Sequence, residues 1–261
     1  MTARIRVALI YGGASGEHSV SCLTAASVMR AMDPDKYEVL PIGIRKDGTW
    51  VPGTINPAEL EESGPHGEVP DSPDRMVIGS GEDGSVVYRV GTDRVDAYAV
   101  DVAFPLLHGP FGEDGTIQGL FEMAGLPYVG AGVFASAAGM DKHYMKVVLE
   151  AAGLPVVPYV LATSKLWRHE REVVMRKAQE TLTWPVFVKP ARAGSSLGIS
   201  RVERVEDLPA AIETAQEVDP KVLIEQGIVG REIECAVLGG HGDDPARASV
   251  LGEIALDTQW Y

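Results

Sequence analysis

Residues that could bind phosphate gather in one stretch of the chain. Lys189 ends a short apolar run, and a loop with two glycines and two serines begins at Gly194, five residues later. Backbone N–H groups and serine hydroxyls can surround phosphate oxygens, and a lysine neutralises their charge. The loop lacks the Gly-Lys-Ser/Thr ending of a Walker A loop, and residues 199–202 favour a strand. Taken alone, the loop fits a hairpin turn equally well, and Lys189 fits a strand-end lysine that reaches solvent.

Two carboxylates, Glu225 and Glu232, lie on either side of a turn. Glu225 ends an apolar run that favours a strand, and Glu232 follows Gly230. Carboxylates accept hydrogen bonds from amino and hydroxyl groups, including those of a ribose. A pair of solvated loop acids is the ordinary alternative, and for isolated glutamates the residues alone favour it.

Glu17 and His108 each follow an apolar segment in the first half of the chain. Glu17 lies in a glycine loop after residues 5–11, and His108 follows residues 95–107. Ligands of α/β sheets usually bind at the carboxyl ends of the strands, so Glu17 could bind a ligand ammonium and His108 could line the same cleft. The alternatives are an acid that complements a helix dipole and a loop histidine that binds nothing.

The elements that would position these residues alternate between strands and helices. The patterns predict strands at residues 5–11 and 37–44, a helix at about 20–32, a hairpin from 76–78 and 86–90, and one strand at 95–107 before a short helix. The Pro-, Gly- and acid-rich stretch 52–74 predicts a surface loop without chemistry. The alternation indicates a partly parallel sheet with helices on its faces.

A second domain is predicted after residue 130, where the pattern changes. Helices are expected at residues 140–152, 164–181 and 205–218, and strands at 156–162, 186–189, 221–225 and 232–238. The phosphate-binding candidates therefore lie in the second half of the chain, and Glu17 and His108 lie in the first half.

Composition narrows the function classes. The chain has 261 residues, of which 45% are hydrophobic and 23% charged, as in a globular protein of one to three domains. A net charge of −14 opposes nucleic-acid binding. The first residues lack a signal-peptide core or membrane span, which favours the cytoplasm and no membrane partner. Cys22 and Cys235 have neither disulfide nor zinc spacing and are expected to be buried free thiols.

Several of these segments, in this order, resemble the signatures of the D-alanine:D-alanine ligase family. They are residues 12–21, 107–115 and 188–196, with further similarity at 139–142, 222–226 and 230–232. The resemblance covers essentially the whole chain. It implies an α/β (α+β) protein with a Rossmann-like N-terminal domain at residues 1–130 and an ATP-grasp fold after it. The central ATP-grasp lobe would span residues 131–228, and the last lobe would begin at 229–261 and be incomplete.

The resemblance also implies roles for individual residues. Glu17 would receive the ammonium of the first D-alanine and form a catalytic hydrogen-bonded group with Ser195, and His108 would lie beside that substrate. The residues expected to bind ATP are Lys142, Phe187, Lys189, Ser195, Ser196, Glu225, Gln226, Ile228, Glu232 and Trp260. Ligands for Mg²⁺ or Mn²⁺ are expected after Tyr261 and none within the chain.

The implied reaction joins two D-alanine molecules for peptidoglycan precursor synthesis. The carboxylate of the first attacks the γ-phosphate of ATP, and the amine of the second attacks the resulting acyl phosphate. The family suggests a homodimer. The alternatives are a D-alanine:D-lactate ligase and a non-catalytic nucleotide-binding fragment. A dinucleotide-binding oxidoreductase is more distant, because residues 12–16 lack GxGxxG spacing.

Overall fold

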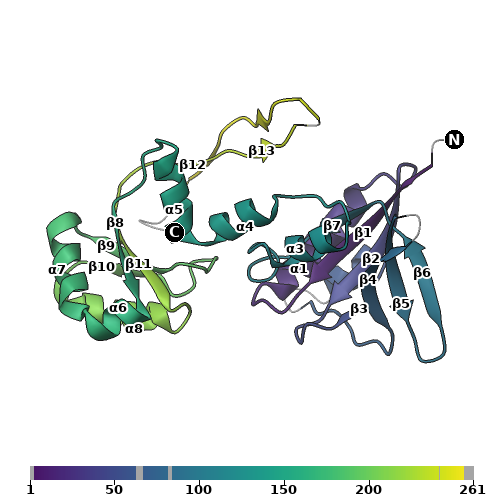
Figure 1. Cartoon of the computed structure of the whole chain (residues 1–261), viewed down its shortest axis with the longest axis horizontal. Coiled ribbons are helices and arrows are strands. Elements are labelled where there is room, and N and C mark those ends of the chain that lie inside the picture. Colours follow the sequence, from purple (N-terminus) through teal and green to yellow (C-terminus); the bar gives the residue numbers. More distant parts are fainter. Residues whose placement is uncertain (1–2, 63–66, 82–83, 241, 256–261) are drawn as a thin grey trace. The chain divides into compact units, whose positions relative to one another are not determined.

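The computed structural model describes residues 3–62, 67–81, 84–240 and 242–255 and divides the chain into two compact units (Figure 1). Unit 1 comprises residues 1–155 and 191–194, and unit 2 comprises residues 156–190 and 195–261. Both units mix strands and helices, which confirms the predicted α/β class. The domain limits at residues 130 and 228 stay predictions.

Unit 1 is built on a four-stranded sheet in the order β3-β2-β1-β7. Its strands are β1 (Ile5–Gly12), β2 (Tyr37–Ile44), β3 (Trp50–Pro52) and β7 (Val102–Pro105). Strands β2 and β7 run parallel to β1, and β3 is antiparallel to β2. Every residue of β1 from Val7 onward is buried, as expected of a strand covered on both faces.

Helices cover both faces of this sheet. On one face Leu9 and Tyr11 pack against Cys22 and other small residues of α1 (His18–Ala31). On the other face Ile10 packs with Phe121 of α3 (Thr116–Met123). A separate antiparallel sheet follows the order β4-β5-β6. Its strands are β4 (Arg75–Gly81), β5 (Gly84–Val90) and β6 (Val95–Ala99).

Two predictions for unit 1 were wrong. Residues 95–107 form two strands in different sheets. The chain turns between these strands at Asp101, whose carboxylate accepts hydrogen bonds from the backbone N–H and the guanidinium of Arg6. Residues 52–74 are more than a surface loop, since they contain helix α2 (Pro57–Glu62) and bury Leu60 and Val69 in the core beside α1. Apolar residues spaced without a period gave no signal for that packing.

The end of unit 1 contains two helices where one was predicted. Helix α4 (Val133–Met140) precedes α5 (Lys142–Ala151). Asp141 separates them, because its carboxylate accepts the N–H groups of His143 and Tyr144 at 3.1 and 3.2 Å and so caps α5. The cap fixes Lys142 as the first residue of α5.

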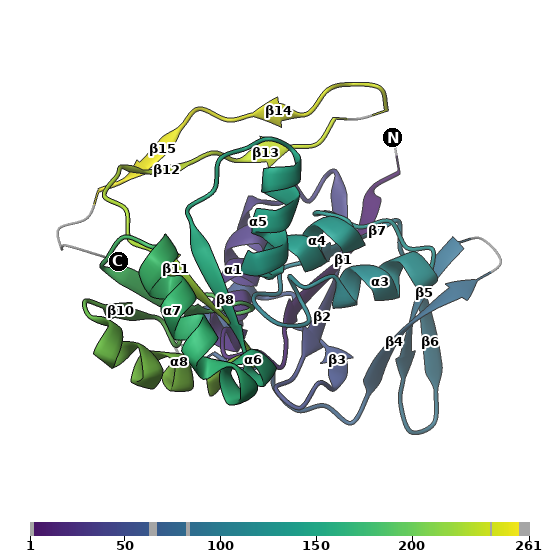
Figure 2. The same ribbon diagram turned by 60° about the vertical axis from the view of Figure 1, so that its left-hand side comes forward.

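Unit 2 contains a four-stranded antiparallel sheet in the order β10-β9-β11-β8. Its strands are β8 (Tyr159–Thr163), β9 (Val186–Pro190), β10 (Ser200–Val202) and β11 (Lys221–Gln226). One face packs against three helices, which gather on the same side of it in Figure 2. They are α6 (Ser164–His169), α7 (Arg171–Thr181) and α8 (Leu208–Gln216), the last preceded by a short 3-10 helix, η2 (Val205–Asp207).

Two predicted elements of unit 2 are divided in the structure. The single helix expected at residues 164–181 is broken at Glu170, which separates α6 from α7. The strand expected at 232–238 forms two short strands in an extended pair of exposed ribbons, visible at the top of Figure 2. These are β12 (Glu232–Glu234) with β15 (Gly252–Ile254), and β13 (Val237–Leu238) with β14 (Arg247–Ala248).

No helix among the residues that the structure describes has both the length and the apolar character needed to cross a membrane.

Cys22 is buried, and burial raises the pKa of its thiol to about 11. Cys235 is exposed, so the prediction of a second buried thiol was wrong. Its place on an exposed ribbon explains the difference.

Candidate functional site

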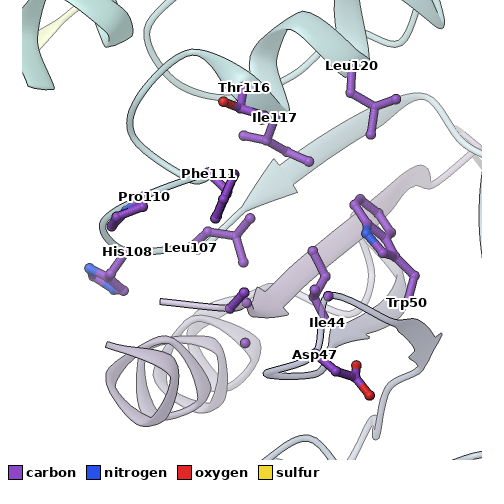
Figure 3. Close-up of a pocket in the computed structure, with 14 residues that line it drawn as sticks. Ile44, Asp47, Trp50, Leu107, His108, Pro110, Phe111, Thr116, Ile117 and Leu120 are labelled. Carbon is purple, nitrogen blue, oxygen red and sulfur yellow. The ribbon is translucent and has the colours of Figure 1, made fainter. Parts of the chain in front are cut away.

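A pocket of about 400 Å³ opens at the carboxyl edge of the parallel strands of unit 1 (Figure 3). The ends of β1 and β2, the β2–β3 turn, the segment after β7 and the start of α3 form its walls. Figure 3 shows Ile44, Trp50, Leu107 and Ile117 turned toward one space, whereas the imidazole of His108 points to the side. The pocket therefore offers apolar surface next to the loops that carry the predicted polar residues.

Glu17 and His108 lie in two loops that are bonded to each other. The hydroxyl of Ser15 donates to the His108 carbonyl at 2.7 Å, and the backbone N–H of Glu17 donates to the same hydroxyl at 3.2 Å. A Cβ atom added to Gly109 would lie 2.8 Å from Oε2 of Glu17, so the carboxylate rests directly against this glycine. The structure thus brings these two predicted residues to one edge of the sheet. Their role as substrate ligands stays a prediction.

Asp114 holds the loop after His108 in place, and the sequence reasoning did not select it. Its carboxylate accepts the N–H groups of Phe111 at 2.9 Å and Thr116 at 3.0 Å. Partial burial acts to raise the pKa of Asp114, but these hydrogen bonds outweigh it and hold the pKa below its usual range. Phe111 has a φ of +68° in the left-handed region, a strained conformation that the Asp114 bond supports. The sequence signal that could have identified Asp114 is an aspartate two residues before the first residue of a helix, a spacing at which its side chain can accept the N–H of that residue.

Lys142 contacts the segment that precedes the glycine-serine loop. Its Nζ donates to the carbonyl of Ala193 at 2.5 Å, and its backbone N–H donates to the carbonyl of Ala191 at 3.0 Å. The cap of α5 fixes the lysine backbone, so residues 191–194 are held at the N-terminal end of that helix. Lys142 and the beginning of the predicted phosphate loop therefore lie together in unit 1.

Three residues predicted to bind ATP form one cluster in unit 2. Along β9 the side chains alternate, so Val186 and Val188 enter the core and Phe187 and Lys189 lie on the opposite face. Glu225 of β11 pairs in register with Phe187. The Lys189 ammonium forms an ion pair with the Glu225 carboxylate and lies 5.7 Å from the centre of the Phe187 ring. The cluster combines an aromatic surface, a cation and a carboxylate, which can contact the base, the phosphates and the hydroxyl groups of a nucleotide.

The glycine-serine loop has an unusual backbone. Ser195 and Ser196 have φ values of +49° and +55°, and both are exposed. Consecutive non-glycine residues in the left-handed region are disfavoured by about 1 kcal/mol or more each, and such strain is concentrated at ligand sites. Gly198 closes the loop with a φ of +71°, where a Cβ atom would lie 2.9 Å from Pro190 and Val218. The loop is therefore built to a defined shape.

The remaining predicted ATP ligands are more dispersed. The Gln226 side chain accepts the N–H of Thr183 at 3.0 Å and so ties β11 to the segment before β9. Ile228 is exposed after β11, and Glu232 is exposed in β12. The predicted contact of Trp260 lies outside the described residues. The role of Glu232 as an ATP ligand stays a prediction.

Comparisons with known proteins agree across the chain. Residues 6–131 match the family described as D-ala D-ala ligase N-terminus, and residues 148–261 match D-ala D-ala ligase C-terminus. A D-alanine–D-alanine ligase of Paenarthrobacter aurescens is 54% identical over 98% of this chain, and one of Arthrobacter sp. strain FB24 is 54% identical over 97%. The chain spans 68% and 67% of the length of these two relatives.

Solved structures show the same relationship. The VanG D-Ala:D-Ser ligase of Enterococcus faecalis is 34% identical with a TM-score of 0.82, covering 99% of this chain and 74% of that one. The D-alanine-D-alanine ligase of Coxiella burnetii is 31% identical with a TM-score of 0.79, covering 96% and 68%.

Proposed function

The chain belongs to the D-alanine–D-alanine ligase family, and we propose on that basis that it acts in an ATP-dependent ligase that joins two D-alanine molecules. The observation that carries the proposal is the 54% identity over nearly the whole chain with relatives of that name. The dipeptide would enter peptidoglycan precursor synthesis. The requirement for ATP is the argument for a cytoplasmic location, and the family suggests a homodimer.

On the substrate side, Glu17 binds the ammonium of the first D-alanine. Its carboxylate lies against Gly109, beside His108, at the carboxyl edge where α/β sheets bind ligands. A carboxylate recognises an ammonium by charge and by accepting its N–H bonds. His108 lines the same place, with Nε2 3.2 Å from the hydroxyl of Thr24.

On the nucleotide side, the cluster of Phe187, Lys189 and Glu225 receives ATP. The Lys189 ammonium, which pairs with Glu225 here, turns to a phosphate, and Glu225 then accepts bonds from the adenosine part. Lys142, Ser195 and Ser196 bind further phosphate oxygens. The shaped backbone at the two serines supports this assignment, because successive N–H groups in such a conformation bind anions.

A divalent cation, Mg²⁺ or Mn²⁺, is the cofactor that the use of ATP implies. In the part of the chain that the structure describes, no group of three or more His, Cys, Asp or Glu side chains could hold a metal ion.

The proposed reaction has two steps. A carboxylate oxygen of the first D-alanine attacks the γ-phosphorus of ATP, and ADP leaves. The amine of the second D-alanine attacks the acyl carbon, the phosphate leaves with that carboxylate oxygen, and the amine loses a proton. Lysine charges stabilise the phosphoryl transfer, and the loop of Ser195 and Ser196 keeps water from the acyl phosphate.

The test is a steady-state assay of the full-length protein with ATP and D-alanine. We expect equal amounts of ADP and D-alanyl-D-alanine, and no comparable product with D-lactate or D-serine as second substrate. Glu17→Gln should raise the KM for D-alanine by about tenfold or more, because it removes the charge that meets the ammonium. ADP formation that does not depend on D-alanine would overturn the proposal. A D-lactate ligase is not favoured, because the relatives cited above are named as dipeptide ligases.

A further inference from the structure

His18, which follows Glu17, is buried and uses both ring nitrogens. It is 1% exposed. Nδ1 lies 2.7 Å from the carbonyl of Gly13, and Nε2 lies 3.1 Å from the backbone nitrogen of Val69. A carbonyl only accepts and a backbone N–H only donates, so the ring is neutral, with its proton on Nδ1. His18 thus joins the first glycine loop to a segment about fifty residues away.

Val69 fits a space that two glycines leave at the strand ends. A Cβ atom on Gly12 would lie 2.7 Å from Cγ2 of Val69, and one on Gly43 would lie 2.5 Å from its Cγ1. Gly12 has a φ of +91°, Val69 is buried, and the Lys46–Glu68 ion pair holds the residue before it. The Val69 side chain therefore occupies space in which a side chain at Gly12 or Gly43 would lie.

The path from Val69 to Glu17 is short. The Val69 N–H bonds the His18 ring, His18 is the first residue of α1, and Glu17 is its N-cap. The Ser15 hydroxyl holds the other side of the loop to the His108 carbonyl. If Val69 leaves, Nε2 of a buried imidazole loses its donor, and the start of α1 loses the bond that orients it.

We propose that residues 67–70 and His18 form a positioning element for Glu17. Docked Val69 holds His18 in the neutral Nδ1–H form, and His18 fixes the start of α1 so that the Glu17 carboxylate meets the ammonium of the first D-alanine. His18 is a positioning residue and touches no substrate in this account. The inference rests on the proposed function, since it concerns how that function's substrate is bound.

The kinetic test uses Gly43→Ala, which displaces Val69 without changing a residue assigned to the site. Gly81→Ala is its matched control, because the added Cβ would lie 2.7 Å from Cγ2 of Val86 in the distant β4–β5 hairpin. In the full-length protein, Gly43→Ala should raise the KM for D-alanine about tenfold and leave the KM for ATP within about twofold, since small displacements at a site have large effects. Gly81→Ala should change neither. Equal effects of the two variants, or equal effects on both substrates, would overturn the inference.

A second variant separates positioning from packing. His18→Phe fills the ring volume without either hydrogen bond, and His18→Asn keeps a donor near the Gly13 carbonyl. We expect the KM for D-alanine to rise more in His18→Phe than in His18→Asn. A purely structural role predicts that the order of the variants follows their thermal stability, with no selectivity for D-alanine.

A measurement without catalysis decides the inference if the proposed function fails. In ¹⁵N-histidine NMR spectra of the full-length protein, assigned with His18→Asn, the His18 ring should show the Nδ1–H tautomer. The Val69 amide should exchange slowly, and Gly43→Ala should accelerate that exchange while Gly81→Ala does not. An Nε2–H or cationic ring, or a rapidly exchanging Val69 amide in the unaltered protein, would overturn the positioning element. Absence of D-alanine-dependent ADP formation would contradict only the proposed function.

Discussion

At the scale of single residues, the proposed function gives the Lys189–Glu225 pair two arrangements, one without nucleotide and one with it. Without nucleotide each charge neutralises the other on a partly buried face, with side chains 25% and 12% exposed. A triphosphate offers Lys189 a stronger anionic partner, and Glu225 then becomes available to hydroxyl or amino donors. In the proposed function, the ion pair therefore balances the charges of Lys189 and Glu225 before ATP binds.

Lys189→Met tests this exchange. The variant should raise the KM for ATP by more than tenfold, because the phosphates lose a cation, and should leave the KM for D-alanine within about twofold. It should also destabilise the protein by about 1 kcal/mol, since Glu225 stays partly buried without its partner. Steady-state kinetics and thermal unfolding measure both effects. Glu225→Gln is the control that keeps the cation, and an unchanged KM for ATP in Lys189→Met would contradict the assignment.

At the scale of elements, the loop from His108 to α3 depends on Asp114. The hydrogen bonds from Phe111 and Thr116 lower the pKa of this carboxyl in the folded state. A lowered folded pKa means that the stabilisation is present above the unfolded pKa, near 4, and is lost as the pH falls through the folded value.

Asp114→Ala should therefore reduce the free energy of unfolding by about 1 kcal/mol at neutral pH, the usual effect of losing such a cap. The difference from the unaltered protein should shrink as the pH is lowered below about 4. Denaturant unfolding at several pH values measures it. A difference that stays constant or grows in acid would contradict the role of the carboxylate.

Much of this local structure could be predicted from the sequence. The continuous apolar run of β1 and the glycines between β4 and β5 are local patterns. The structure has β1 within one residue of the predicted bounds and the hairpin strands within three. The meeting of Glu17 and His108 at one edge followed from parallel topology. Contacts between residues far apart in the sequence had no local signal. Examples are the packing of Val69 against Gly43, the ion pair of Arg6 with Asp101, and the ion pair of Lys189 with Glu225, 36 positions further along the chain.

At the scale of the whole molecule, the boundary between the two units falls inside the predicted phosphate loop. Residues 191–194 belong to unit 1, where Lys142 holds Ala193, and Ser195 begins the part in unit 2. The loop is therefore one of three places where the chain passes from one unit to the other, the others being residues 155–156 and 190–191. In the proposed function it also keeps water from the acyl phosphate.

Replacing residues 194–197 by two glycines should uncouple ATP use from ligation. Without the loop, water reaches the acyl phosphate, so phosphate release should exceed dipeptide formation by about twofold or more. Phosphate and dipeptide are measured in the same samples, and Gly81→Ala serves as a variant outside the loop. A ratio that remains at one, with a lower rate, would contradict the shielding role and leave only a role in binding.

The proposed acyl-phosphate mechanism is tested most directly by following the carboxylate oxygens of D-alanine. The full-length protein is incubated with ATP and D-alanine labelled with ¹⁸O in both carboxylate oxygens, and the phosphate and dipeptide are analysed by mass spectrometry. Attack of the carboxylate on the γ-phosphate predicts one ¹⁸O atom in each phosphate released and one in the peptide carbonyl. Dipeptide formed together with unlabelled phosphate would contradict the account.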